Sequence, residues 1–302
     1  MNLDAMIQEL TDKTRGTLLI NEPMRYHTSF RIGGPADAFF LPTDEEDVKI
    51  ALLACQQHGV PVTVIGAGTN LLVSDLGIEG LVLCLNRRLT SISIDDCYMT
   101  VGGGAQLSVV SAVAAQRSLA GLEFAVGIPG TVAGAVAMNS AAHGSRMSDI
   151  VSRVRALRLD GTEVVLKAGD CGFGEKTSVF QNQEYVIVEV VLRLQPGDGD
   201  QIAKARDKYA KDRSAKQPLE YPSAGCVFKN PAGGGAGRYI DQAGCKGLRV
   251  GDAEVSRLHA NFIVNLGNAT ARDVVQLINQ VQKLVIDKVG VRLEPEIRII
   301  GR

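Results

Sequence analysis

The chain has 302 residues, of which 45% are apolar and 22% charged, and its 32 basic side chains nearly balance 33 acidic ones. Such a mix is typical of a folded protein of two or three domains and excludes a disordered chain. The balanced charge and the absence of tryptophan argue against nucleic acid or a lipid surface as the main partner.

The amino-terminal residues MNLDAMIQELTDK contain early acidic residues and no uninterrupted apolar core. They do not resemble a secretory signal, so we expect a cytoplasmic protein. The six cysteines show no C-x-x-C spacing and no cluster with histidine. Disulfides and a metal site are therefore poor interpretations of them.

The first clear helix is predicted between two sets of boundary signals. Thr43 and Glu46 form a capping box at its start, and Gly59 and Pro61 stop it. Short strands are expected on either side of the glycine turn that follows, GAGTN (66–70). This part of the chain reads as an α/β segment.

The middle of the chain has a second glycine-rich turn. We expect two short strands over 91–106, with the turn GGGA at 102–105, and then a helix over 107–121. A stretch without any formal charge, Phe124–Ser145, comes next. Its function is the first question that the sequence raises.

A β-hairpin is predicted over 153–167, because Asp160 and Gly161 at its tip favour a type I′ turn. A further strand ends in a turn near 197–200, where we place a domain boundary. A highly charged helix over 200–216 opens the last part of the chain.

The carboxyl-terminal part contains a Pro/Gly-rich section over 217–237 and a long helix over 270–290. That helix carries a full apolar stripe, made of Val274, Val275, Leu277, Ile278, Val281, Leu284 and Val285. The closing residues 291–302 are expected to form a strand that returns to the first domain.

The uncharged stretch is a poor membrane span, because it is rich in Ala and Gly and contains Pro129, Asn139 and His143. Its turn GIPGTVAG (127–134) instead offers bare backbone to a ligand, as does the turn at 66–70. Together these turns suggest a cradle for a large cofactor that carries a pyrophosphate. The plainer alternative is that the glycines only make turns.

The nicotinamide-binding fingerprint is not met. GAGTNL lacks a third glycine and leads into a β-like run instead of a helix. A Rossmann dehydrogenase is therefore disfavoured.

Six motifs occur together and in a fixed order. They are TSFRIGGPAD (28–37), GAGTNLLVSDLGIEGLVL (66–83), GLEFAVGIPGTVAGAVAMN (121–139), KQPLEYPSAGCVFKNP (216–231), AGCKGLRVGDAEVSRLHANFIVN (243–265) and LEPEIRIIG (293–301). In these motifs the chain resembles the UDP-N-acetylenolpyruvoylglucosamine reductase family, in the form without a large insertion in the last domain. The resemblance covers essentially the whole chain.

The resemblance implies an α+β protein with the FAD-binding fold of vanillyl-alcohol oxidase and p-cresol methylhydroxylase, followed by an α+β substrate domain. The implied domains are 1–85 with the returning strand 293–302, then 86–200, then 201–292. FAD would lie between the first two domains. Nothing in the sequence supports a covalent flavin link.

The implied activity is that of a cytoplasmic oxidoreductase of peptidoglycan synthesis, and hence of cell-wall biogenesis, cell shape and cell division. NADPH would reduce the FAD, which would then reduce the enolpyruvyl group of UDP-N-acetylglucosamine enolpyruvate to give UDP-N-acetylmuramate. Hydride addition leaves negative charge next to the carboxylate, so a cation or hydrogen-bond donor and a proton donor are needed.

Three residues match the family's catalytic positions. Glu296 takes the glutamate position, and Cys226 takes the position of a serine. A thiol, with a pKa of roughly 8.5, is a more willing acid than a hydroxyl near neutrality. Lys176 in FGEKTS stands where the family typically has the arginine of FGYR-x-S. A strand-edge carboxylate and a small packed thiol are the plain alternatives for Glu296 and Cys226.

Further positions are carried over from the resemblance. The implied cofactor contacts are Arg31, Gly66, Ala67, Gly68, Thr69, Asn70, Gly127, Ile128, Pro129, Gly130, Thr131, Gly134 and Asn139. The implied substrate contacts are Lys216, Lys229 and Asn230, for which surface solvation of the lysines is the plain alternative.

The chain also departs from the family pattern near the cofactor. The departures are Ala133, Ser140, Ala142, His143, Glu175, Lys176, Cys226 and Asp252. They leave open an FAD-binding paralogue that has lost or changed the reductase activity, as an alternative to the active enzyme.

Overall fold

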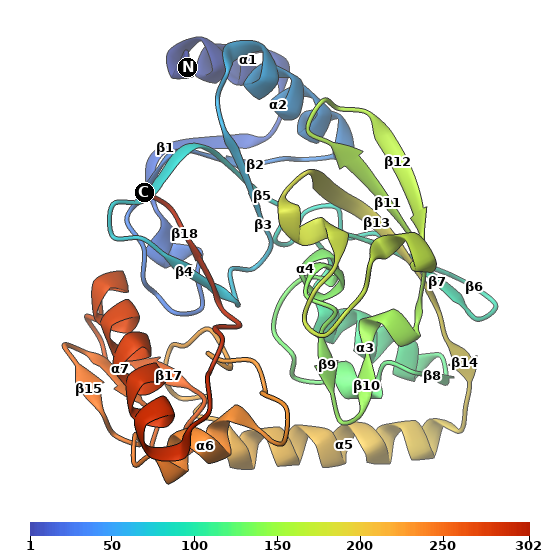
Figure 1. Ribbon diagram of the computed structural model, residues 1–302. Coiled ribbons are helices and arrows are strands. Elements are labelled where there is room, and N and C mark those ends of the chain that lie inside the picture. The colour runs from blue at the N-terminus through green and yellow to red at the C-terminus, as the bar shows by residue number, and fades with distance from the viewer. The chain divides into compact units, whose positions relative to one another are not determined.

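The computed structural model describes residues 1–302, and its helices and strands are labelled in Figure 1. The chain divides into two compact units. The first unit contains Met1–Asn21, Asp37–Ala67 and Gly80–Asp212. The second contains Glu22–Ala36, Gly68–Glu79 and Arg213–Arg302. The three domains expected from the sequence stay a prediction.

Two sheets and five helices make up most of the first unit. Its helices are α1 (Leu3–Lys13), α2 (Glu45–His58), α3 (Leu107–Gln116), α4 (Val132–Ala137) and α5 (Gly199–Lys216), whose last turn passes the division at Asp212. Its longer strands are β1 (Thr17–Pro23), β2 (Pro35–Leu41), β3 (Val62–Ile65), β5 (Ile78–Cys84), β6 (Ile92–Asp95), β7 (Tyr98–Gly102), β11 (Val151–Arg158), β12 (Glu163–Lys167) and β13 (Tyr185–Arg193). One end of each of β1, β2 and β5 passes the division into the second unit. The two-residue strands are β8 (Leu119–Ala120), β9 (Ala141–Ala142), β10 (Ser145–Arg146) and β14 (Gln195–Pro196).

The four-stranded sheet has the order β1-β2-β5-β3 and packs with α1 and α2 around one apolar cluster. The α2 helix forms where predicted, and Gly59 ends it in the left-handed conformation. The expected cap at Thr43 is wrong, because the side chain of Asp44 accepts from the Asp47 N–H and so caps the helix one residue later.

The five-stranded sheet has the order β12-β11-β13-β7-β6, and all its pairs are antiparallel. The predicted hairpin is present as β11 and β12. Its turn is not of type I′, because that type needs positive φ at both central residues, and of the two only Gly161 has it. Instead, the Gly161 N–H donates to the Arg158 carbonyl and the Arg158 N–H donates to the Thr162 carbonyl, which closes a wider loop.

The uncharged stretch Phe124–Ser145 folds into short elements of the first unit. It contains the six-residue helix α4 and most of the small β9–β10 hairpin, and side chains such as Phe124 and Val136 are buried. No helix anywhere in the chain is long and apolar enough to cross a membrane.

The second unit combines two helices with a three-stranded antiparallel sheet, in the order β15-β16-β17, and a parallel strand pair. Its elements are β4 (Leu71–Val73), α6 (Ala236–Gln242), β15 (Arg249–Val250), β16 (Ala253–Val255), β17 (Ile263–Asn265), α7 (Ala271–Val289) and β18 (Arg298–Ile300). The pair joins β18 to β4, so the last strand returns to a segment from the first third of the chain.

Helix α7 forms as its apolar stripe predicts, and the stripe is buried in the core of the second unit. Thr270 and Asp273 make a capping box at its start. The carboxylate of Asp75 also accepts from the Ala271 and Arg272 N–H groups, at 2.8 and 3.1 Å. The loop after β4 is thereby fastened to the first turn of α7.

Candidate active site

The glycine turns at 66–67 and 127–134 meet within the first unit. A Cβ atom at Gly66 would collide with the hydroxyl of Thr131, so only glycine permits this approach. Gly127 and Gly130 have φ values of +73° and +125°, which side chains rarely adopt. The backbone is therefore bare where the two turns meet, as the predicted cradle requires.

The glycine-rich turn at 102–105 forms hydrogen bonds with the residues that follow Thr131. The Val132 and Ala133 N–H groups donate to the carbonyls of Ala105 and Gly103, each at 2.9 Å. A Cβ at Gly103 would lie 3.3 Å from the Cβ of Ala133, besides colliding with the Ile187 carbonyl. Ala133, one of the departures from the family pattern, therefore fits because its neighbour is glycine.

Thr131 and Asn139 lie in this region with their side chains engaged by the protein. The Thr131 hydroxyl accepts from the Gly134 N–H at 3.2 Å and caps α4. Asn139 is buried, donates to the Gly174 carbonyl at 2.8 Å and accepts from the Ser148 N–H at 2.9 Å. These contacts give both residues a structural part in the first unit.

Lys176 lies at the tip of a tight turn in the first unit. The Gly174 N–H donates to the Thr177 carbonyl at 3.0 Å, which leaves Glu175 and Lys176 as the two tip residues. Lys176 has a φ of +55°, in the left-handed region. Its carbonyl accepts from the Gln181 side chain at 2.7 Å.

His143, another departure, forms the tip of the β9–β10 hairpin together with Gly144, and both have positive φ. Its ring stacks on Tyr209 of α5, with centroids 3.9 Å apart and an interplanar angle of 8°. This hairpin is therefore fastened to α5.

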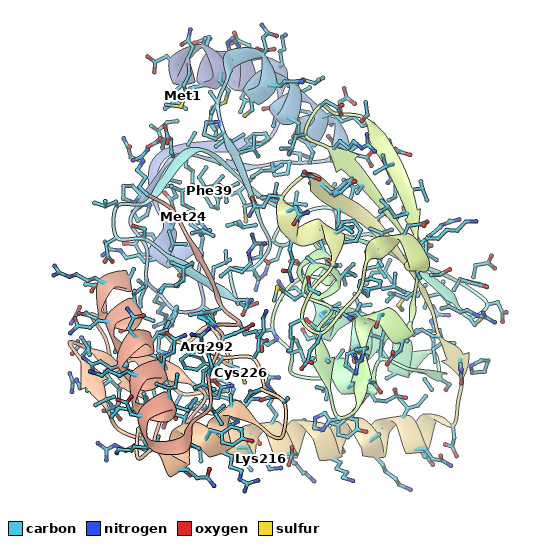
Figure 2. The ribbon with its side chains drawn as sticks, in the orientation of Figure 1. Met1, Met24, Phe39, Lys216, Cys226 and Arg292 are labelled. Atoms are coloured by element: carbon cyan, nitrogen blue, oxygen red, sulfur yellow. The ribbon has the colours of Figure 1, made fainter.

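The second unit brings Cys226 and Glu296 onto neighbouring backbone segments. Phe228 forms a bridge with Pro295, and the Glu296 N–H donates to the Val227 carbonyl at 2.7 Å. Both side chains are partly exposed. Figure 2 labels Cys226 among the side chains of this unit. The predicted proton donor and the predicted carboxylate thus belong to one local structure.

Asn261 holds the Cys226 segment from the other side. Its buried carboxamide accepts from the Phe228 N–H at 2.9 Å and donates to the Phe228 carbonyl at 2.8 Å. The Asn261 side chain thereby makes the two hydrogen bonds to Phe228 that a neighbouring strand would otherwise make. Sequence reasoning missed this residue, although it lies inside the fifth motif.

The loop with Arg31 is also fixed from within the second unit. Arg31 is exposed and has a φ of +56°. Its N–H donates to the Thr28 carbonyl, and buried Asn265 donates to the carbonyl of Phe30 at 3.0 Å. Asn265 therefore helps to hold Arg31 in this unusual conformation.

The candidate cofactor residues Gly68, Thr69 and Asn70 belong to the second unit. Gly68 approaches the carbonyl of His27 so closely that a Cβ would collide with it. The side chain of Asn70 donates to the carbonyl of Glu296 at 3.2 Å. Asn70 thus supports the backbone of the candidate carboxylate.

The candidate substrate residues are spread over the second unit. Lys216 is exposed at the last residue of α5 and is labelled in Figure 2. The ammonium of Lys229 lies 3.8 Å from the carboxylate of Glu294. The side-chain oxygen of Asn230 accepts from the Ala236 N–H at 2.9 Å and so fixes the glycine-rich loop before α6.

Arg213 is a charged neighbour of Cys226 that sequence reasoning missed. Burial lowers the pKa of its guanidinium, while the attraction of the Cys226 side chain opposes that shift. No local pattern marks Arg213, because α5 carries charged residues on all sides.

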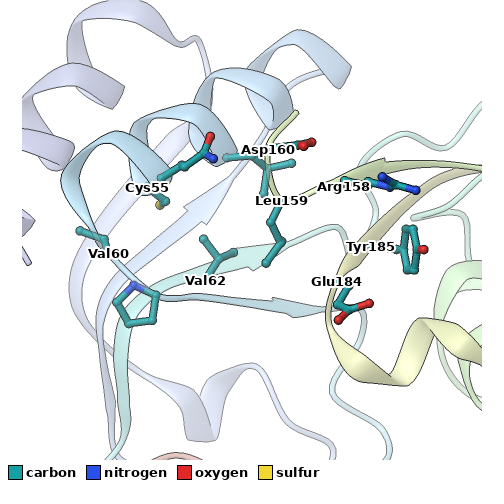
Figure 3. A pocket seen from close by; sticks show the side chains of 11 residues that line it. Cys55, Val60, Val62, Arg158, Leu159, Asp160, Glu184 and Tyr185 are labelled. Atoms are coloured by element: carbon teal, nitrogen blue, oxygen red, sulfur yellow. The ribbon is translucent and has the colours of Figure 1, made fainter. Parts of the chain in front are cut away.

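A separate cavity of about 640 Å³ opens in the first unit (Figure 3). Cys55, Arg158, Glu184 and Tyr185 are among its lining residues. Burial raises the pKa of the Cys55 thiol to about 12, so this sulfur stays protonated near neutrality. None of the candidate site residues lines the cavity.

Comparison with known proteins matches two parts of the chain to two different domain families. Residues 36–167 match the profile of an FAD binding domain, and residues 217–300 match that of the UDP-N-acetylenolpyruvoylglucosamine reductase C-terminal domain. The chain is 44% identical to the UDP-N-acetylenolpyruvoylglucosamine reductase of Anoxybacillus flavithermus, over 99% of this chain and 100% of that one.

Solved structures give the same result for the fold. The enzyme of that name from Thermus caldophilus matches 94% of this chain and 98% of its own, with a TM-score of 0.80 at 34% identity. The 4-ethylphenol oxidase of Gulosibacter chungangensis matches 96% of this chain and 64% of its own, with a TM-score of 0.50 at 15% identity, and this likeness concerns the fold alone.

The expected α+β fold, with an FAD-binding domain of the vanillyl-alcohol oxidase and p-cresol methylhydroxylase type, is thus confirmed. The relative from Anoxybacillus is similar over nearly the full length of both chains, far beyond what one shared domain would give. This chain therefore belongs to the UDP-N-acetylenolpyruvoylglucosamine reductase family.

Proposed function

We propose that this protein is an FAD-dependent oxidoreductase that uses NADPH to reduce the enolpyruvyl group of UDP-N-acetylglucosamine enolpyruvate, giving UDP-N-acetylmuramate for peptidoglycan synthesis. The observation that carries the proposal is the placement of Cys226 and Glu296 on bridged segments within the family's C-terminal domain. Because both substrates are nucleotides of the cell interior, we place the reaction in the cytoplasm.

The residues of the first unit fit FAD. Gly66, Gly127 and Gly130 leave the backbone bare where two turns meet, which suits the close approach of a pyrophosphate. Ala67, Ile128, Pro129 and Thr131 complete these turns. When bound, FAD supplies the transfer of hydride from NADPH to the carbon–carbon double bond of the substrate.

Three side chains handle the charge and the proton of this reaction. Cys226 donates a proton to the carbon next to the carboxylate, and the positive charge of Lys176 stabilises the negative charge that develops there. Glu296 is the second acidic group of the site. Lys216, Lys229 and Asn230 bind the substrate, while Arg31, Gly68, Thr69, Asn70, Gly134 and Asn139 contribute to the cofactor site.

The test is the consumption of NADPH by the purified, FAD-loaded protein with and without UDP-N-acetylglucosamine enolpyruvate. We expect rapid oxidation of NADPH only when this substrate is present, with UDP-N-acetylmuramate as the product. A yellow protein that oxidises NADPH no faster with the substrate than without it would contradict the proposal and favour an inactive paralogue.

A further inference from the structure

The turn that carries Lys176 stores backbone strain. Lysine at a φ of +55° lies in the left-handed region, where its Cβ approaches the following carbonyl oxygen more closely than in the ordinary helical region. Such a residue keeps its conformation only where its surroundings fix the backbone. The question is therefore which groups fix this one.

Two side-chain amides donate hydrogen bonds to two different carbonyls of the turn. Asn139 donates to the carbonyl of Gly174 at 2.8 Å, and Gln181 donates to the carbonyl of Lys176 itself at 2.7 Å. Asn139 is almost completely buried, with 3% of its surface exposed, and its oxygen is engaged by Ser148. The orientation of the Asn139 carboxamide is therefore fixed by the Ser148 N–H, independently of its bond to the turn.

Asn139 and Gln181 thus act as a clamp on the turn. The carboxyl-terminal end of α4 supports this clamp. The carbonyl of Ala137 accepts from the Ser178 hydroxyl at 2.8 Å and from Gln181 at 3.1 Å. Carbonyls at a helix end lack partners within the helix, so these two donors satisfy a real need. Thr131, which caps the start of the same helix, lies in the glycine turn at 127–134.

The exchange of arginine for lysine gives this clamp its importance. An arginine can fix its own charge by forking onto a carboxylate, whereas a lysine ammonium is a point charge on a flexible stem. The accuracy with which a lysine places its charge then depends on how well its backbone is held. Displacing a catalytic group by about 1 Å can cost about a hundredfold in rate.

We propose that Asn139 and Gln181 are positioning residues that hold Lys176 in its left-handed turn and so place its charge for the reaction. This inference rests on the proposed function. It also assigns Asn139 a part other than direct contact with the cofactor.

The first experiment is a double-mutant cycle on the FAD-loaded protein, with Gln181→Met and Lys176→Met. Gln181→Met keeps the length of the side chain and removes the donor. We expect it to lower kcat about tenfold to a hundredfold, with little change in KM and in the rate at which NADPH reduces the flavin. In the Lys176→Met background the same change should cost nothing further. Additive losses in kcat would overturn the proposal.

The second experiment follows the turn without reference to catalysis. Trypsin cleaves after lysine, so cleavage of the FAD-loaded protein at the Lys176–Thr177 bond reports how tightly the turn is held. We expect Gln181→Met to accelerate this cleavage at least tenfold and to speed amide exchange over 174–177. Unchanged cleavage and exchange would overturn the proposal even if activity fell. If Gln181→Met fails to fold, Gln181→Glu keeps the shape and is judged by the same criteria.

Gln183→Met is the matched control. Gln183 lies two residues further along the same loop and accepts from the Val64 N–H at 3.2 Å, away from the Lys176 turn. It should change neither kcat nor cleavage at Lys176, and an effect equal to that of Gln181→Met would count against the proposal. If the parent protein shows no substrate-dependent activity, the proposed function fails, while the cleavage and exchange measurements still decide whether Gln181 holds the turn.

Discussion

At Lys176 the side chain offers one ammonium group, where the resemblance led us to expect an arginine. The turn that presents it is tied down by amides of the protein itself. At Cys226 a thiol stands in the position of a hydroxyl, on a segment that runs beside Glu296 and near the guanidinium of Arg213. In the proposed reaction Lys176 supplies a positive charge and Cys226 a proton, and each assignment can be tested by restoring the more usual residue.

The charge of Lys176 is tested by two substitutions. Lys176→Arg should preserve or raise turnover, because a guanidinium keeps the charge and can direct two parallel N–H groups at a carboxylate. Lys176→Met should lower kcat/KM by about a hundredfold or more, the usual cost of about 2.7–4 kcal/mol for losing one stabilising donor. Steady-state assays of NADPH oxidation check this. A Met variant as active as the parent would mean that another cation carries the charge.

The proton of Cys226 is tested by a separate pair. Cys226→Ser should retain much of the activity, whereas Cys226→Ala should lose most of the product-forming step. In both variants NADPH should still bleach the flavin, since this half-reaction needs no proton from the thiol. Stopped-flow absorbance separates the two steps. If the Ala variant forms product at the parent's rate, the thiol is not the donor.

At the scale of elements, side-chain amides repeatedly take the place of missing strand partners. Asn261 does so for Phe228, and Asn265 bonds Phe30 and the loop before α7. These amides are buried, so each unsatisfied group would cost about 1–3 kcal/mol. They explain how short, irregular segments can hold site residues as firmly as a sheet would.

Removal of the Asn261 amide should therefore be strongly destabilising. Asn261→Ala leaves the N–H and carbonyl of Phe228 without these partners, and we expect the free energy of unfolding to fall by about 2–5 kcal/mol. Urea denaturation measures it. Asn279→Ala, an exposed asparagine on α7, is the control and should change stability by less than about 0.5 kcal/mol. Equal losses of unfolding free energy in the two variants would refute this role of the Asn261 amide.

The contact between α1 and α2 should depend on pH. Hydrogen bonds from Lys13 and His58 lower the pKa of Glu9 below its ordinary value of 4.5. A carboxylate with a lowered pKa stabilises the fold above its unfolded pKa, and this contribution is lost as the pH falls through the folded pKa. Glu9→Gln should thus be less stable than the parent at neutral pH, by up to about 1 kcal/mol, and the difference should vanish in acid. A difference that persists in acid would exclude this origin.

The helices and strands were largely predictable from the sequence, whereas the long-range hydrogen bonds of the buried side-chain amides were not. The apolar stripe of α7 shows a helical period, and α5 is rich in Ala, Lys and Arg, which favour a helix; both signals depend only on neighbouring residues. The cap of α2 was misplaced by one residue because Thr43 and Asp44 are both good caps. The bonds of Asn139 to Gly174 and of Asn261 to Phe228 join residues 35 and 33 positions apart, a separation that no local pattern encodes.

For the whole molecule, the candidate site residues are shared between two compact units. Lys176 and the paired glycine turns belong to the first, while Cys226, Glu296 and Arg31 belong to the second. The motifs of the sequence predicted this set of residues in chain order. The grouping of Glu22–Ala36 and Gly68–Glu79 with the carboxyl-terminal part was not predicted, because it arises from pairing across most of the chain.

Binding of FAD should stabilise the whole chain. Free FAD at about a hundred times its Kd should add about 2.7 kcal/mol to the free energy of unfolding. Gly130→Ala should lose much of this gain, because its turn needs a φ of +125°. Gly290→Ala is the control, because Gly290 also has positive φ, has open space around it and lies outside the cradle. Thermal unfolding with and without FAD compares them, and an equal gain in both variants would rule out Gly130 as a cradle residue.

The second unit draws on three stretches of chain, and the Asn70 side chain binds the carbonyl of a residue 226 positions later. During synthesis, the two early stretches must wait for the last one before they can pair. Closing so long a loop costs roughly 5 kcal/mol in chain entropy. The unit with Cys226 and Glu296 should therefore mature last, and an unfinished chain would expose the unpaired edge of β4 to chaperones or to aggregation.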